Sequence, residues 1–503
     1  MAKPGNQLNQ DSLPISLYTA AAVRQLDQLA IESRGIPGLT LMRRAASACV
    51  DALCRHWPGA RDVRVYCGSG NNAGDGFLMA GMLAEKGYRV TVAVVGQPSS
   101  LGADATEAHR YCLSTTAKVN TWTPLGQVEA DVVVDALLGT GLSGEVRAHY
   151  ADAIKEINTS GKPVLAVDIP SGLSSDTGVR LGASVSASVT VTFIGLKCGM
   201  FTLDGPDACG RIEFSDLQVP SDIYEGVDAA AHRIDLDELR RQLPVRPRNA
   251  HKNQFGHVLV VGSDAGMGGA VAMSAEAALR SGAGLVSVAT HPVNTAAILA
   301  RRPELMVRGV ENPNALAPLL ERASVLVLGP GLGQDDWGRQ MFAAVMAASH
   351  ERHPPMVVDA DGLTLLGEQP EARDNWVLTP HPGEASRLMP DVDIQSDRFD
   401  AVTRLQAAYG GAALLKGAGT VIADGHANYL CDLGNPGMST AGMGDVLSGV
   451  VGGLLAQGLT VSRATRLAVA VHAAAGDACS ARGGERGLVA TDLMADIRRL
   501  LNP

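Results

Sequence analysis

Residues 435–449 read N-P-G-M-S-T-A-G-M-G-D-V-L-S-G, a glycine-rich turn that leads directly into a predicted helix beginning near Asp445. The backbone N–H groups of residues 441–444 are expected to form an anion-binding hole at the positive end of this helix. The helix end favours the ionised form of Asp445, and a carboxylate beside a phosphate-binding turn is suited to remove a proton from a hydroxyl. Helix capping is the structural alternative for this aspartate, but the preceding A-G-M-G points beyond capping to catalysis.

Other loops in the second half of the chain follow predicted strands and carry similar residues. The predicted strands are His257–Val261, Leu285–Ala289, Ser324–Leu328, Met356–Asp359, Trp376–Thr379 and Ala412–Lys416. The loops are G-S-D-A-G-M-G-G-A (262–270), G-P-G-L-G (329–333), D-A-D-G-L (359–363), T-P-H-P-G-E (379–384) and K-G-A-G-T (416–420). Each loop alone is compatible with an ordinary turn, and His381 between two prolines with a rigid surface turn. Because the carboxyl ends of parallel strands meet on one edge of a sheet, the loops together predict one rim of backbone amides, a histidine, a lysine and carboxylates.

The first half of the chain contains a second glycine-rich block, C-G-S-G-N-N-A-G-D-G, at residues 67–76. It follows a predicted strand at Val63–Cys67 and opens a predicted helix at Asp75–Lys86. Its glycines permit a tight turn and the close approach of a phosphate-bearing ligand. An ordinary strand-to-helix turn is the alternative, but two asparagines and an aspartate are poor choices for a turn with no other role.

Two more loops of the first half lie at the ends of predicted strands, V-D-A-L-L-G-T-G-L-S-G-E (134–145) and V-D-I-P-S-G (167–172). On a shared rim, Asn72, Asp135 and Ser171 present oxygen atoms to a common point. Oxygen ligands favour a hard cation over zinc or copper. Capping of helices by the aspartates of these loops is the structural alternative.

Composition supports an α/β protein of two domains. The chain has 503 residues, 57 glycines and only 4% aromatic residues, which suits many tight strand-to-helix turns. Runs such as V-V-V-D-A-L-L-G are apolar on both faces, as buried parallel strands require. Helices are predicted at Thr19–Ser33 and Leu39–Leu53, and further strands at Arg89–Val95, Asp131–Asp135 and Val164–Asp168.

The domain boundary is expected near residue 230, because the stretch 219–252 combines prolines with mixed charge. We therefore predict a disordered leader at residues 1–16, a first doubly wound α/β domain at 17–228 and a second at 229–503. The two domains are expected to follow each other in tandem along the chain.

Charge and cysteine usage restrict the class of protein. Lys and Arg number 42 against 52 Asp and Glu, a net charge of −10 that argues against nucleic-acid binding. The eight cysteines include no C-x-x-C pair, which favours reduced thiols in the cytosol. Residues 1–10 lack the apolar core of a signal peptide, and the uncharged stretch 446–462 is too polar for a membrane span. A cytoplasmic, soluble protein is expected.

The three loops of the first half, with Y-T-A-A-A-V-R-Q-L-D-Q-L-A-I (18–31) and G-I-P-G-L-T-L-M (35–42), resemble the NAD(P)H-hydrate epimerase family. That family interconverts the R and S forms of nicotinamide cofactors hydrated at C6. The resemblance implies a Rossmann-like three-layer fold, a potassium ion on Asn72, Asp135 and Ser171, and Asp168 as acid or base. It implies substrate contacts from Asn71, Asn72, Ala73, Gly74, Asp75, Gly139, Thr140, Gly141, Leu142, Ser143, Gly144, Glu145 and Asp168.

Three positions bear on this first resemblance. The family motif reads N-N-G-G-D-G, and Ala73 replaces one glycine, which requires a negative φ at that residue. Arg43 stands where an acidic residue usually follows L-M. A partner lysine has no clear position: Lys197, in I-G-L-K-C-G-M, matches a late K-x-G pattern and is equally compatible with a solvated lysine. A first domain that binds its ligand without epimerising it therefore stays open.

The second half, from about Lys252 to the end, resembles the NAD(P)H-hydrate dehydratase family, a branch of the ribokinase-like superfamily. That family removes water from the S form of hydrated NADH or NADPH, and bacterial-type members use ADP with magnesium, giving AMP and phosphate. The resemblance implies Asp445 as the base, with substrate contacts from Ala270, Gly331, His381 and Asp445. It implies nucleotide contacts from Lys416, Gly417, Ala418, Gly419, Thr420 and Gly444. Met443 replaces a common threonine, which removes a hydroxyl and leaves the backbone hole.

Together the resemblances predict a bifunctional enzyme that repairs hydrated nicotinamide cofactors. Spontaneous hydration gives both epimers, and a dehydratase that accepts one epimer benefits from a fused epimerase. The expected ligands are NADHX, NADPHX, ADP, Mg²⁺ and K⁺, and a homo-oligomer is expected. The alternative is a ribokinase-like small-molecule kinase with a non-catalytic N-terminal binding module.

Overall fold

The computed structural model describes residues 13–97, 101–124 and 127–502. The chain divides into two compact units, the first ending at His232 and the second beginning at Arg233. Of the predicted leader, residues 1–12 lie outside the described residues. Leu13 is buried and Ser16 begins a strand, so ordered structure starts before the predicted residue 17. None of the helices in the described ranges combines the length and apolar character needed to cross a bilayer.

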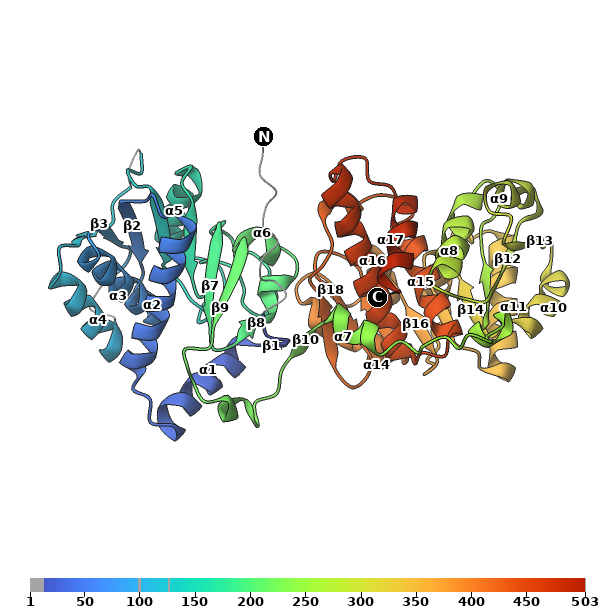
Figure 1. The fold of residues 1–503 in the computed structure, drawn as a ribbon, viewed down its shortest axis with the longest axis horizontal. Helices are drawn as coiled ribbons and strands as arrows, with labels where there is room; N and C mark the ends of the chain where they lie inside the picture. Colours follow the sequence, from blue (N-terminus) through green and yellow to red (C-terminus); the bar gives the residue numbers. More distant parts are fainter. Residues whose placement is uncertain (1–12, 98–100, 125–126, 503) are drawn as a thin grey trace. The chain divides into compact units, whose positions relative to one another are not determined.

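Within the described residues, a seven-stranded parallel sheet forms the centre of the first unit, in the order β4-β3-β2-β5-β6-β7-β9. Figure 1 labels β2, β3, β7 and β9 of this sheet. Its strands are β2 (Asp62–Cys67), β3 (Arg89–Val94), β4 (Lys118–Thr121), β5 (Val132–Ala136), β6 (Val164–Val167), β7 (Val189–Phe193) and β9 (Arg211–Ser215). The chain builds outward from β2 to β4, then returns to β5 and builds in the other direction. The strand order therefore reverses between β2 and β5, and ligands of open α/β sheets bind at such a switch point.

Helices cover both faces of this sheet. One face packs on α1 (Ala20–Gln28), α2 (Gly38–His56), α3 (Asn71–Glu85) and α4 (Ala103–Leu113), and the other on α5 (Ala148–Thr159). Successive strand residues point to opposite faces, so Val65 and Val134 join the first core while Tyr66 and Val133 join the second. These three layers confirm the predicted Rossmann-like architecture.

A short strand group joins distant parts of the first unit. Strand β1 (Ser16–Tyr18) pairs with β10 (Ala231–Arg233) in antiparallel fashion through Leu17 and Ala231. It also pairs in parallel with β8 (Leu196–Lys197), where Tyr18 lies opposite Lys197. The short helix α6 (Gly205–Cys209) and a π-helical turn (Leu29–Ser33) also belong to this unit.

The second unit is built on a second, mainly parallel sheet, in the order β13-β12-β11-β14-β15-β16-β17-β18-β19. Its strands are β11 (His257–Val261), β12 (Leu285–Thr290), β13 (Met306–Gly309), β14 (Val325–Leu328), β15 (Met356–Val358), β16 (Trp376–Leu378), β17 (Ala412–Leu415), β18 (Thr420–Ala423) and β19 (Asn428–Cys431). The chain runs outward from β11 to β13 and then returns to β14, which places the switch point between β11 and β14. Strand β18 runs antiparallel to both of its neighbours, β17 and β19.

Close helix packing builds the second core. Helix α15 (Met443–Ala456) crosses α8 (Gly268–Arg280), and a Cβ on Gly449 would lie 2.0 Å from the backbone oxygen of Ser274. A glycine at residue 449 therefore lets the two backbones touch. The other helices are α7 (Leu236–Arg241), α9 (Thr295–Arg301), α10 (Pro313–Arg322), α11 (Asp336–Arg352), α12 (Asp361–Glu368), α13 (Pro382–Leu388), α14 (Arg398–Tyr409), α16 (Val461–Gly483) and α17 (Leu493–Leu500).

Two features of the sequence prediction need correction. The helix predicted from Asp75 begins at Asn71, so most of N-N-A-G-D-G forms the first turn of α3 and not a loop. The strands β4, β7, β9, β13, β18 and β19 were not predicted. Edge strands such as β4, whose sequence is K-V-N-T, are polar and largely exposed, so they lack the apolar run that identified the central strands.

Candidate active sites

A cavity of about 610 Å³ opens in the first unit beside the switch point of the sheet. Many predicted substrate contacts line it, namely Asn71, Asn72, Asp75, Gly139, Thr140, Gly141, Leu142, Ser143, Glu145 and Asp168. Of the described residues predicted for this site, Ala73, Gly74 and Gly144 do not line the cavity. The structure thus brings together the three loops that follow β2, β5 and β6.

The first turn of α3 explains how this chain accommodates Ala73. Ala73 is buried and lies in the helix, so its φ is negative. A residue with a methyl side chain is therefore tolerated at this position. The neighbouring Gly74 is the tighter position, because a Cβ there would lie 2.6 Å from the Met42 sulfur and 3.1 Å from the Ala105 Cα, so the Met42 side chain would have to shift. Arg43 stands where the family usually has an acidic residue. Its guanidinium group stacks over the Tyr111 ring, 5.1 Å from the ring centroid.

Asp168 and Lys197 form a buried ion pair at the wall of the cavity. The Lys197 side chain is fully buried, and its Nζ donates to Asp168, to Thr192 Oγ1 at 2.7 Å and to the Phe193 backbone oxygen at 3.3 Å. The solvated-lysine alternative is therefore wrong. The signal in the sequence is a single charged residue in the apolar run 189–200.

Two more carboxyl groups, Asp27 and Asp75, line the same cavity. Burial raises the pKa of Asp27 to about 6, helped by the negative charge of Asp168 and opposed by Lys197. Burial also holds the pKa of Asp75 well above its usual value, again helped by Asp168. Asp27 was missed by sequence analysis, although it lies four residues after Val23 on the apolar side of α1.

The three residues predicted to bind a cation lie together under the loop after β5. Asp135 is fully buried and accepts hydrogen bonds from the Ser171 N–H at 2.8 Å and the Ser171 hydroxyl at 2.6 Å. Asn72 donates its Nδ2 to the Leu138 oxygen at 3.3 Å, while its buried Oδ1 has no hydrogen-bond partner among the described residues. Burial raises the pKa of Asp135 to about 6, against the bonds from Ser171. Asp135 also accepts from the Leu137 N–H at 3.2 Å, but none of the described helices begins there, so the helix-capping alternative is wrong for Asp135.

The second unit also has its predicted loops in mutual contact at the carboxyl ends of its strands. A Cβ on Gly331 would lie 3.2 Å from the Ala270 methyl carbon, and one on Gly329 would lie 1.8 Å from the Asp359 backbone oxygen. A Cβ on Gly444 would lie 3.2 Å from Lys416 Nζ. The loops after β11, β14 and β15 therefore contact one another, and Lys416 after β17 reaches the N-terminus of α15.

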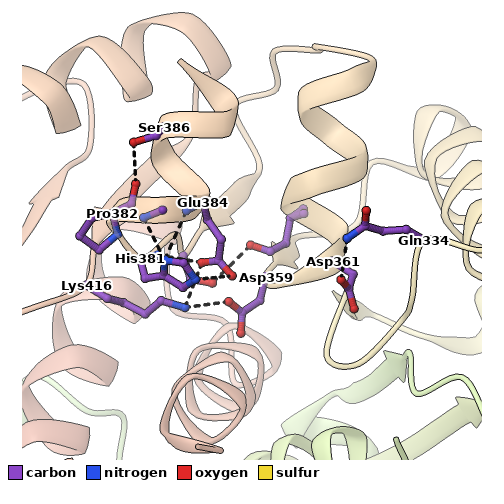
Figure 2. A network of polar contacts seen from close by, with 11 residues as sticks. Gln334, Asp359, Asp361, His381, Pro382, Glu384, Ser386 and Lys416 are labelled. Carbon is purple, nitrogen blue, oxygen red and sulfur yellow. Dashed lines mark hydrogen bonds and ion pairs between the residues drawn. The ribbon is translucent and has the colours of Figure 1, made fainter. Parts of the chain in front are cut away.

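Lys416 lies among acidic side chains in this second site (Figure 2). Its Nζ is 3.0 Å from Asp359 Oδ1 and 3.6 Å from Glu384 Oε2. Burial lowers the pKa of Lys416, but the two carboxylates outweigh it and the net shift is upward. His381 caps α13 through its Nδ1, which accepts from the Gly383 and Glu384 N–H groups at 3.0 and 3.3 Å. In neutral His381 the proton therefore lies on Nε2.

Asp445 is the third residue of α15 and does not cap that helix. The N-cap is Gly442, with φ +93°, and no side chain caps the helix. The capping alternative for Asp445 is therefore wrong. The helix end is expected to favour the ionised form of Asp445, but burial, with Asp359 and Glu384, raises its pKa to about 7 against the opposing charge of Lys416.

Strained backbone occurs at strand ends in both sites. Asp168 follows β6 with φ +68°, Ser263 follows β11 with φ +57°, and Ala360 follows Asp359 with φ +48°. Residues with side chains rarely adopt such angles, and they persist where the surrounding structure holds them, typically at functional sites. In this chain each lies in a loop that the sequence places on the rim of a predicted site.

Among the residues that the structure describes, no cluster of three or more His, Cys, Asp and Glu side chains is arranged to hold a metal ion. Asn and Ser oxygens, which make up most of the cation set in the first unit, are not among those side-chain types. For the second unit, the sequence predicts Mg²⁺ but assigns no residues to bind it. There Mg²⁺ is expected to depend on nucleotide phosphates as well as carboxylates.

Comparison with known proteins covers both units. A family model described as NAD(P)H-hydrate dehydratase matches residues 258–499, and one described as YjeF-related protein N-terminus matches residues 38–199. A solved structure of a ribokinase-like superfamily protein from Enterococcus faecalis V583 is 31% identical and covers 54% of this chain and 94% of its own, with a TM-score of 0.50.

Two curated relatives match along nearly their whole length. The bifunctional NAD(P)H-hydrate repair enzyme Nnr of Coxiella burnetii is 45% identical, over 97% of this chain and 99% of that protein. The protein of the same name from Escherichia coli K12 is 40% identical, over 98% of this chain and 96% of that protein. The chain belongs to the family of bifunctional NAD(P)H-hydrate repair enzymes.

Proposed function

We propose that the first unit epimerises R- and S-NAD(P)HX and that the second unit dehydrates S-NAD(P)HX with ADP, giving NAD(P)H, AMP and phosphate. The proposal rests on the observation that one chain contains both the cavity lined by Asp168, which pairs with Lys197, and the Asp445 site. Its relatives along the full length carry the name of bifunctional repair enzymes, which favours repair over the alternative of a small-molecule kinase.

In the second unit, Asp445 is proposed as the base that removes the proton of the C6 hydroxyl. The hydroxyl oxygen then attacks the terminal phosphorus of ADP, the bond to the bridging oxygen breaks, and AMP leaves. The ring nitrogen drives loss of phosphate from C6, and a proton leaves C5, which restores the dihydropyridine. Mg²⁺, when bound with the nucleotide, neutralises charge on the phosphates. Substrate contacts from Ala270, Gly331 and His381 and nucleotide contacts from residues 416–420 and Gly444 are part of this proposal.

In the first unit, Asp168 is proposed as the acid or base at C6. Lys197 fixes the orientation of the Asp168 carboxylate, since its ammonium group is held by three acceptors in all. Asp27 and Asp75 line the same cavity, and burial raises the pKa of both, so each holds a proton more readily than an exposed aspartate.

A potassium ion fits the oxygen set of Asn72, Asp135 and Ser171. Within the described part of the chain the buried Asn72 Oδ1 has no hydrogen-bond partner and is an open acceptor, and Asp135 supplies a buried carboxylate. A bound cation would offset the charge of Asp135 and tie the loops after β5 and β6 to α3. We propose that these three residues hold K⁺.

The function is tested by incubating the full chain with hydrated NADH and each nucleotide in turn. Recovery of the absorbance band of reduced nicotinamide with ADP, and none without nucleotide, is the expected result. A protein that restores no absorbance but phosphorylates a small alcohol from ATP is a kinase, and the proposal fails. The assignment of one activity to each of the domains 17–228 and 229–503 is tested by assaying the two activities after each site is inactivated separately.

The cation site leads to a prediction about Asp135→Asn. Because the folded-state pKa of Asp135 is raised to about 6, binding K⁺ favours the ionised form and should strengthen as pH rises through that value. At pH 8, K⁺ should raise the melting temperature of the wild type by roughly 2–4 °C relative to choline at equal ionic strength. The shift should shrink at pH 5 and vanish in Asp135→Asn.

The control for this thermal-shift measurement is Asp152→Asn, which removes an exposed carboxylate on α5 and should keep the K⁺ response. An equal K⁺ shift in Asp135→Asn and in the wild type would remove Asp135 from the ligand set.

A further inference from the structure

Arg398, the first residue of α14, is an arginine with 1% of its surface exposed, and it holds the loop between β17 and β18. Its Nη1 donates to the Ala418 oxygen at 2.7 Å. Its Nη2 donates to the Leu415 and Lys416 oxygens at 2.8 and 3.1 Å. One buried guanidinium therefore binds three backbone carbonyls of the same short loop.

These bonds determine which way the peptide groups of the loop face. In a trans peptide the carbonyl and the following N–H point in opposite directions. Because the carbonyls of residues 415, 416 and 418 turn inward to Arg398, the N–H groups of residues 416, 417 and 419 turn away from it. The first of these donates to the Pro380 oxygen at 2.9 Å, and the other two belong to Gly417 and Gly419.

The two glycines adopt backbone angles that allow this arrangement. Gly417 has φ +144° and Gly419 has φ +63°, values that residues with side chains rarely adopt. A Cβ on Gly417 would also lie 3.0 Å from Arg398 Nη2. The loop therefore needs glycine both for its conformation and for its contact with the guanidinium group.

We propose that Arg398 is a positioning residue for nucleotide binding. It holds the 416–420 loop so that the Gly417 N–H group faces an anionic ligand, the diphosphate of a nucleoside diphosphate. Arg398 is too deeply buried to touch that ligand itself. The inference rests on the proposed function, which assigns the nucleotide to this loop. Lys416 also belongs to the loop, and its Nζ contacts Asp359, so the same guanidinium supports the position of that ion pair.

The role of Arg398 is tested with the variant Arg398→Lys. Binding of ADP with Mg²⁺ to the full chain is measured by titration calorimetry. Lysine keeps the positive charge but cannot bind three carbonyls in one plane. The expected result is an ADP dissociation constant and an ADP KM raised by about tenfold or more. The KM for hydrated NADH should stay within about twofold, since its proposed contacts lie on other loops.

Arg373→Lys is the matched control. Arg373 is a buried arginine of the same unit that donates to Ser349 and, at 3.2 Å, to the Met346 oxygen, both in α11. Its substitution is expected to cost stability without changing ADP affinity. Gly417→Ala disturbs the same contact from the loop side and should weaken ADP binding in the same way, so it decides the matter if Arg398→Lys does not fold.

Three outcomes overturn the inference. They are an unchanged ADP dissociation constant in both Arg398→Lys and Gly417→Ala, an equal rise in Arg373→Lys, or equal rises in the KM of ADP and of hydrated NADH. If the wild type itself does not bind ADP, the proposed function fails as well. Wild-type ADP binding together with unchanged variants overturns only the role of Arg398.

Discussion

Replacing Asp445 with Asn should abolish dehydration while epimerisation continues at the wild-type rate. The amide cannot take the proton of the C6 hydroxyl, and loss of a general base typically costs about 10²–10⁴-fold in rate. Ammonium and backbone groups near residue 445 remain, so ADP should still bind. Dehydration is followed by the recovery of reduced-nicotinamide absorbance, and epimerisation by chromatography of the R and S forms.

The pH dependence gives this prediction a second readout. Burial raises the pKa of Asp445 to about 7, and a base acts in its ionised form. The wild-type kcat/KM for hydrated NADH should therefore rise about tenfold per pH unit below about 7 and level off above it. The residual rate of Asp445→Asn should not show this rise with pH.

Stability separates loss of the base from loss of the fold. A carboxyl whose pKa is raised on folding stabilises the folded state fully below its ordinary value near 3.8, and this contribution disappears as pH rises through about 7. Asp445→Asn should therefore be at least as heat-stable as the wild type at pH 8. Asp391→Asn, an exposed change in the same unit, should leave turnover unchanged. Normal dehydration by Asp445→Asn would refute the role of this residue.

Replacing Asp168 with Asn should reduce epimerisation by about 10²–10⁴-fold, close to the rate in buffer alone. The isosteric amide removes the acid–base group and leaves Lys197 without a carboxylate partner. The measurement is best made in an Asp445→Asn background, which cannot consume the S form. R-NADHX is added and its conversion to the S form is followed by chromatography.

Asp152→Asn in the same background is the control, because it also removes one carboxylate from the first unit but lies on the exposed side of α5. Dehydration by the single Asp168→Asn variant should be normal with S-NADHX. If the parent Asp445→Asn exchanges R and S forms no faster than buffer, the first unit is a binding module. If the parent exchanges the two forms faster than buffer, and Asp168→Asn in that background exchanges them equally fast, another residue is the acid or base.

The sequence predicted the central strands of both sheets closely. Strands such as β5 and β14 are short apolar runs between glycine-rich turns, and this local pattern is enough to identify them. It also predicted that the loops after these strands converge, because parallel strands end on a common edge. The start of α3 at Asn71 was missed, since asparagine and glycine favour turns in the absence of tertiary contacts.

By itself, the amino-acid sequence determined the two α/β units, their glycine-rich loops and the residue types that those loops present. Only the tertiary structure decided which distant groups share a site: Lys197 against Asp168, Asp27 on the same cavity, and Arg398 beneath the 416–420 loop. Burial in the folded protein likewise raises the pKa of Asp445. The reason is that glycine and apolar patterns act over a few neighbouring residues, whereas ion pairing and desolvation depend on groups far apart in the chain that folding brings together.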